Sequence, residues 1–384
     1  MTENTAEVPS EGISVAIEVD YSQVSGKKAE CPEGCGMCCL CQPEVLPEER
    51  SFFRTKYPKM MVKSRCADQH FALAMKKGRG SCVFLNGRKC DIYKNRTTYC
   101  RQFPYHFYVS DKIEVELDLS CRGVWTGKGN DAEAEAKELA QASERRLSTA
   151  LKEASSVYRE FYSICEDAGV MCDIPQLRAS VTENLMNFTN LAYVTKVMDV
   201  SLEEAKMSLD KVMPDSKFNL EELTDAAREA SLASMASDDP LNVPVYCDKD
   251  YNWNMFMVRD GKIEWSVMDD EGDLSQKGSV DVKDIPLIEP DESGKEVLAE
   301  YIKVLNGRDS FLGNVFYMMD EYGYEDDMAN TYYGALCVTI VDLLWRASML
   351  NHFFGTGMGA EGIREAIIFY DMDRLDAPTI GAFV

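Results

Sequence analysis

Ten of the fourteen cysteines lie in the first 130 residues, and they begin with a C-x3-C-x2-C-C run of Cys31, Cys35, Cys38 and Cys39. Thiolates are preferred ligands of zinc and of iron–sulfur clusters, and two cysteines separated by two residues can direct both sulfurs to one metal from a tight turn. Because consecutive side chains diverge, we expect Cys38 and Cys39 to serve different partners. The run therefore predicts a fold that is held together by metal in this part of the chain.

Further cysteines follow singly rather than in pairs, at Cys82, Cys90, Cys100 and Cys121. Structural zinc sites usually show two C-x2-C pairs a dozen or more residues apart. Only Cys35 and Cys38 have this spacing. Single cysteines suit a polynuclear iron–sulfur cluster, so we favour iron–sulfur, and the 4Fe-4S form, over zinc as the bound cofactor. The eight cysteines named so far form the predicted metal-ligand set.

The order and the residue patterns of these motifs resemble those of the YkgJ-type CxxxCxxCC cysteine-cluster family, whose members are described as zinc- or iron-chelating domains. The resemblance spans residues 30 to 125 and is carried by the following residues: Cys31, Cys35, Cys38, Cys39, Cys82, Cys90, Arg96, Cys100, Arg101, Phe103 and Pro104. Thr97 stands where the family usually has proline. One branch resembles flagellin lysine N-methylases, which use S-adenosylmethionine. The resemblance implies metal binding more strongly than it implies any reaction.

Three polar residues near Cys100 are candidates for a supporting role. Arg96 and Arg101 flank Cys100, and His106 follows six residues later. Such side chains could donate hydrogen bonds to cluster sulfurs or to neighbouring carbonyls and so tune the potential. The alternative for the two arginines is a solvent-facing charge.

Two patterns typical of S-adenosylmethionine or nucleotide binding occur in the sequence, but each lacks a feature that usually accompanies it. Cys31, Cys35 and Cys38 share the radical S-adenosylmethionine spacing, but Met37 stands where such enzymes usually have an aromatic residue. Gly355 to Gly362 contains G-x-G-x-x-G, yet the preceding residues have helical rather than strand spacing, which favours a helix–helix connection. No catalytic residue can be assigned.

Charge is distributed unevenly along the chain. Residues 50–110 carry fourteen Lys or Arg against two Asp, a formal charge of +12, whereas the rest of the chain sums to −36. This asymmetry predicts an anionic partner for the basic segment, which could be the thiolate cluster, the acidic remainder of the chain or an acidic protein. We expect a protein partner to dock there. Nucleic acid is disfavoured because the acidic remainder would repel phosphate.

The remaining features predict a cytoplasmic protein without a membrane span. Residues 1–20 carry five acidic residues and no Lys or Arg, the reverse of a secretory signal. The apolar stretch from Tyr332 to Leu350 is broken by Asp342 and Arg346. Four cysteines among apolar neighbours are expected to be small buried hydrophobes rather than ligands: Cys165, Cys172, Cys247 and Cys337.

Periodicity predicts an α+β chain in five parts. These are a mobile arm (1–29), a loop-rich cysteine-cluster domain (30–129), a helical region (130–238), a β-meander (239–290) and a C-terminal helical region (291–384). Apolar residues alternate with acidic ones over 113–119, which indicates a hairpin with 105–109. Helix starts are expected after Asn130-Asp131, near Pro175, at Ser201 and at Asn219, and Asp260-Gly261 is expected to form a hairpin turn.

Three functions are compatible with these observations. The first is a metal-binding protein, with an iron–sulfur cluster, that acts in electron transfer, cluster handling or maturation. The second is an S-adenosylmethionine-dependent protein lysine N-methylase, which is the enzyme class to expect if the chain is an enzyme. The third is a structural zinc module that presents a basic docking face.

Overall fold

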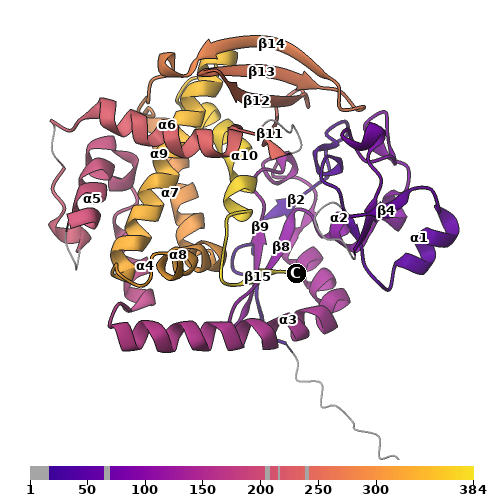
Figure 1. Ribbon diagram of the computed structural model, residues 1–384, viewed down its shortest axis with the longest axis horizontal. Helices are drawn as coiled ribbons and strands as arrows, with labels where there is room; N and C mark the ends of the chain where they lie inside the picture. The colour runs from indigo at the N-terminus through magenta and orange to yellow at the C-terminus, as the bar shows by residue number, and fades with distance from the viewer. Residues whose placement is uncertain (1–16, 65–69, 204–207, 215–216, 238–241) are drawn as a thin grey trace, which may run out of the picture.

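The computed structural model describes residues 17–64, 70–203, 208–214, 217–237 and 242–384. Helices and several small sheets are combined, which confirms the predicted α+β class. Figure 1 shows the cysteine-bearing segment, residues 30–129, beside a helical body. An antiparallel sheet lies along the top and the long helix α3 (Ala132–Ala168) along the bottom. Residues 1–16 of the predicted arm lie outside the described residues.

The cysteine-bearing segment consists of short elements joined by turns, as predicted. The small sheet β3-β5-β4 pairs Glu44–Val45, Phe71–Leu73 and Met61–Lys63. The other elements are α1 (Arg50–Lys56), the hairpin of β6 (Leu85–Asn86) and β7 (Lys89–Cys90), and α2 (Thr98–Gln102). Thr97, at the position of the family's proline, caps α2 by accepting a hydrogen bond from the Cys100 amide at 3.4 Å.

A four-stranded sheet joins this segment to both ends of the described chain. The predicted hairpin is present as β8 (Tyr105–Val109) and β9 (Ile113–Leu117). Its edges are completed by β1 (Val19–Asp20), parallel to β9, and β15 (Ala382–Phe383), antiparallel to β8. The expectation that the chain ends in helix is therefore wrong after Leu375, because the last residues add a strand to this sheet. A second short pairing links β2 (Lys28–Ala29) to β10 (Asn130–Asp131).

Both faces of β9 are buried, although its sequence alternates apolar and acidic residues. The acidic side chains meet partners from the body instead of solvent. The Glu116 carboxylate accepts hydrogen bonds from the amide and hydroxyl of Ser310, and it lies 3.7 Å from the guanidinium of Arg308. Arg308 in turn forms a two-pronged ion pair with Asp371 at 2.7 and 2.8 Å. A buried polar layer thus ties the sheet to the helices.

Capping residues that are recognisable in the sequence mark several helix ends in the helical region. The Asp131 side chain caps α3, and Gly169 ends it with a left-handed φ of 71°. Asn219 caps α6 (Leu220–Met235) as expected. The helix start predicted at Ser201 is wrong, because α5 (Leu191–Glu203) already begins ten residues earlier and Ser201 lies inside it. The fourth helix of the region is α4 (Ile174–Glu183).

The predicted β-meander is present as a four-stranded antiparallel sheet in the order β11-β12-β13-β14. Its strands are Val245–Cys247, Trp253–Arg259, Lys262–Met268 and Leu274–Asp281. Asp260 and Gly261 both have positive φ, 49° and 73°, as a two-residue hairpin turn requires. The sheet contains one strand more than the three expected, since Val245–Cys247 pairs with β12.

The C-terminal helices are α7 (Glu292–Gly307), α8 (Asp309–Glu321), α9 (Met328–Phe354) and α10 (Ala360–Leu375). Within the described ranges, only α9 is long and apolar enough to cross a membrane, but 83% of that window is buried inside the protein, as in a core helix. Asp342 and Arg346, which interrupt it, pair with each other at 2.8 Å. Residues 355–359 connect α9 to α10, which confirms the helix–helix interpretation of the glycine-rich motif.

Hydrophobic packing attaches the cysteine-bearing segment to the body in two places. The main core runs without interruption from β8 and β9 into the helices. A second cluster joins Cys35, Met37 and Leu85 to residues of the meander, among them Cys247 and Trp253. A third cluster, which includes Cys82, lies within the cysteine-bearing segment itself. The metal-ligand candidates therefore lie between two different packing environments.

Candidate metal centre

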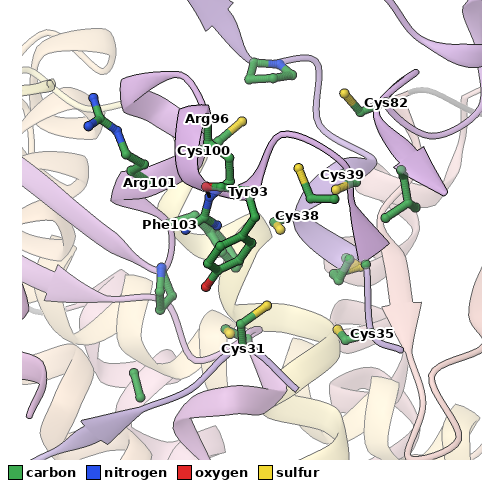
Figure 2. Close-up of a pocket in the computed structure, with 18 of the residues that line it drawn as sticks. Cys31, Cys35, Cys38, Cys39, Cys82, Tyr93, Arg96, Cys100, Arg101 and Phe103 are labelled. Carbon is green, nitrogen blue, oxygen red and sulfur yellow. Dashed lines mark hydrogen bonds between the residues drawn. The ribbon is translucent and has the colours of Figure 1, made fainter. Parts of the chain in front are cut away.

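One cavity of about 890 Å³ gathers all eight predicted ligand cysteines along its walls. They come from separate elements: the loop and short 3-10 turn that hold Cys31, Cys35, Cys38 and Cys39, the turn before β6, the end of β7, helix α2, and the loop after β9. Figure 2 shows Cys31 and Cys35 toward one end of the cavity and Cys39, Cys82 and Cys100 toward the other. The fold therefore brings together thiols that are up to ninety residues apart in sequence.

Cys38 lies between the two ends of the cavity (Figure 2). Its thiol is hydrogen-bonded to that of Cys39, and this bond is the main reason why the pKa of Cys38 is lowered. The turn Met37–Cys39 keeps the two sulfurs together, and the expectation that these neighbours serve different partners stays a prediction.

Burial keeps other thiols of the cavity protonated. It raises the pKa of Cys82 to about 11 and that of Cys100 to about 12. Metal ligation requires the thiolate, so binding would release these protons and should weaken as the pH falls. The chemistry of the donors fits zinc or iron.

The thiols surround the cavity without converging on one point. Across the described ranges, no group of three or more Cys, His, Asp or Glu side chains is arranged to hold a single ion. The cavity is also lined by apolar and aromatic side chains, including Leu73, Phe84 and Tyr93. The site is therefore a thiol-lined cavity.

Arg96 and Arg101 both line the cavity, but they differ in their contacts. Arg96 lies over the Tyr93 ring, 3.8 Å from its centre, and donates to the Tyr93 carbonyl. Arg101 is half exposed and donates to the Thr98 hydroxyl. Both arginines therefore hold loops beside Cys100, and neither contact reaches a sulfur.

His106 does not belong to the cavity lining. Its Nε2 lies 3.4 Å from the Asp118 carboxylate, behind the loop that carries Cys121. The same carboxylate accepts the amide of Ser120 at 2.8 Å, and the Asp118 carbonyl accepts the amide of Cys121. His106 thus contacts the site indirectly, through this loop and through the ring of Phe103, which lines the cavity.

Part of the basic segment is neutralised by the protein itself. Four of its residues pair with two aspartates of the turn between β13 and β14: Lys76 and Arg88 with Asp270, and Lys77 and Arg79 with Asp273. The backbones approach closely as well, since the Ser81 amide donates to the Asp270 carbonyl at 3.0 Å. The acidic remainder of the chain is therefore one anionic partner of this segment. A separate protein partner stays a prediction.

The four cysteines that follow residue 130 fall into two groups. Cys165 and Cys337 are buried in the main core, as expected for small hydrophobes, and Cys172 packs against it. Cys247 is also buried, but its Sγ lies 3.8 Å from the Sγ of Cys35. The sequence interpretation missed this contact, because a single cysteine 126 residues after Cys121 carries no spacing signal.

Residues 30–122 match the family model CxxCxxCC, described as a "putative zinc- or iron-chelating domain". The match covers the eight ligand candidates and ends before α3. This part of the chain is thus similar to the cysteine-cluster family that the motifs indicated. No curated protein and no solved structure matches the chain.

Proposed function

We propose that the thiol-lined cavity binds an iron–sulfur cluster and that the protein acts in electron transfer, cluster handling or maturation. The observation that carries the proposal is the spread of eight cysteines around one cavity of about 890 Å³. Zinc needs four ligands about 2.3 Å from one point. Cluster ligands instead bind different irons, so their sulfurs surround a space.

The test is purification of the protein without oxygen, followed by metal and sulfide analysis. Bound iron with acid-labile sulfide and broad absorption near ~400 nm, typical of thiolate-ligated clusters, is the expected result. A colourless protein with stoichiometric zinc would overturn the iron–sulfur proposal and favour the structural zinc module.

Substitution of the cysteines shows whether the cavity holds the metal. Cys82→Ser and Cys100→Ser should each lose metal and loosen residues 30–122, because metal binding and folding are linked at a site assembled from distant segments. Cys337→Ser, a buried cysteine of the main core, is the matched control and should retain the metal. Full metal occupancy in a Cys82→Ser, Cys100→Ser double variant would show that the C-x3-C-x2-C-C run acts alone.

A lysine N-methylase is the second candidate, and the size of the cavity favours it. Small-molecule pockets usually measure about 300–1,000 Å³, and this cavity is within that range. The glycine-rich residues 355–362 are a helix connection and supply no alternative cradle. Incubation of the anaerobic holoprotein with labelled S-adenosylmethionine and lysine-rich proteins tests this function. Label transferred to lysine would establish it, and absence of cofactor binding would exclude it.

A further inference from the structure

Cys247 lies outside residues 30–122, which match the chelating-domain family, at the end of strand β11 in the meander. Its side chain is 1% exposed, and that of Cys35 is 8% exposed. Their sulfurs are 3.8 Å apart although 212 residues separate them in sequence. Cys35 lines the thiol-lined cavity, whereas Cys247 does not line it and contacts Cys35 from the side of the meander.

The distance between the two sulfurs matches a pair of ligands on one metal. Two sulfurs bound at about 2.3 Å in tetrahedral geometry are about 3.8 Å apart. A disulfide would bring them to about 2.0 Å, and both cysteines are free. The pair therefore already has the separation that one tetrahedral metal imposes.

The backbones of the two cysteines are held reciprocally across the interface. The Cys35 carbonyl accepts hydrogen bonds from Trp253 Nε1 of the meander, at 3.1 Å, and from Arg88, at 3.2 Å. The Cys247 carbonyl accepts a hydrogen bond from Arg122 Nε at 2.5 Å. Arg122 directly follows the predicted ligand Cys121 and is itself paired with Glu365 of α10.

These donors hold the backbone of both cysteines in place. The Arg88 guanidinium also lies 3.4 Å from the centre of the Trp253 ring, which clamps the cysteine loop to β12. Ligating side chains are usually oriented by such surrounding hydrogen bonds, because a preformed geometry lowers the cost of binding metal. Trp253 is itself fully buried, so water does not compete for these contacts.

We propose that Cys247 and Cys35 ligate the same metal atom, which makes the β-meander part of the metal centre. The proposal rests on the proposed metal-binding function. Each thiol loses its proton to solvent on binding and keeps its electron pair for the metal, so no electron is transferred. A four-iron cluster with four cysteines gives each iron one thiolate, whereas a two-iron cluster gives each iron two. The pair thus favours a two-iron cluster over a four-iron cluster at this end of the cavity.

The test compares Cys247→Ala with Cys337→Ala and with the unchanged chain, all prepared without oxygen. Cys337 in α9 is the matched control, because it is equally buried but lies in the main core. Metal per chain is measured first, and the metal-free proteins are then titrated with Co²⁺. Loss of a neighbouring hydrogen-bonding group usually weakens metal binding about 10–100-fold. Loss of a ligand should exceed this, so Cys247→Ala should bind more than ~100-fold more weakly, while Cys337→Ala is unchanged.

A second readout separates ligation from packing. Absorption from thiolate-to-cobalt charge transfer grows with the number of bound thiolates. The smaller change Cys247→Ser should therefore lower this absorption at full Co²⁺ loading while circular dichroism remains unchanged. Equal absorption and affinity in Cys247→Ser and Cys337→Ala would overturn the ligand assignment and leave Cys247 as a packing residue. A Cys35–Cys247 disulfide in the metal-loaded protein would overturn it too. Failure of the unchanged chain to bind any metal would instead refute the proposed function, and this assignment with it.

Discussion

Removing the buried cation Arg308 should destabilise the protein strongly, because the residue joins the four-stranded sheet β1-β9-β8-β15 to the body. Its side chain is 1% exposed. It donates to both oxygens of the Asp371 carboxylate and, at 2.8 Å, to the carbonyl of Leu117 at the end of β9. Arg308→Met keeps a long apolar side chain and removes only the charge and the donors.

The expected loss of folding stability follows from the carboxylates that remain without Arg308. Asp371 is fully buried and would lose the ion pair that Arg308 makes with it, while Glu116 would lose the guanidinium 3.7 Å away. Removing one partner of a buried ion pair costs about 3–5 kcal/mol. Asp371→Asn should cost a similar amount, because it leaves the Arg308 charge unpaired. The double variant should cost less than the sum of the two by about 1–3 kcal/mol, since contacting residues are coupled.

Urea unfolding of the four proteins, followed by circular dichroism at constant pH, measures these free energies. The refuting result is a pair of single variants that each cost less than about 1 kcal/mol, or costs that add within about 0.5 kcal/mol. Either outcome would show that Arg308 and Asp371 do not hold the sheet to the body through their mutual interaction.

Three further changes test other parts of the structure. Burial, with repulsion from Glu116, raises the pKa of Glu114 from 4.5 to about 10, so the folded state holds this proton and loses stability as the pH rises between these values. Glu114→Gln should therefore stabilise at pH 8 but not at pH 4 in urea unfolding, and equal gains at both would contradict this. Gly80→Ala places a Cβ 2.4 Å from the backbone of Glu271 and should cost about 1–3 kcal/mol in thermal or urea unfolding; an unchanged midpoint would contradict the close docking. Trp253→Phe loses the hydrogen bond to the Cys35 carbonyl, which should cost about 0.5–1.5 kcal/mol of stability and weaken metal binding, whereas unchanged metal affinity would count against that contact's role.

Elements with a local signal could be predicted from the sequence. The alternation in residues 113–117 located β9, and Asp260-Gly261 located a turn whose positive φ values need only these two residues. Asn219 marked the start of α6, because its side chain caps the helix three residues on. Ser201 shows the limit of this reasoning. It lies in the last turn of α5, and its hydroxyl donates to the Met198 carbonyl within that helix.

Contacts between distant residues had no such signal. The burial of Glu114 and Glu116 depends on α8, about 195 residues later, so alternation alone predicts the strand but not its two buried faces. The motif predicted that eight cysteines belong together; they line one cavity, and their role as metal ligands stays a prediction. The pairing of β11 with β12 places Cys247 beside Cys35, and no local spacing in the sequence predicts this pairing.

The pairing of β15 with β8 has a consequence for the order in which the molecule is assembled. Ala382 and Phe383 pair with Val109 and Tyr108, and the Val384 amide donates to the Phe107 carbonyl. At a synthesis rate of about 5–20 residues per second, these residues emerge from the ribosome roughly a quarter of a minute to a minute after the hairpin that they complete. Until then the sheet has an open edge beside the nascent cysteine loops. This sheet is therefore completed long after the residues that line the cavity have been made, because all of those residues lie between Ala29 and Ala142.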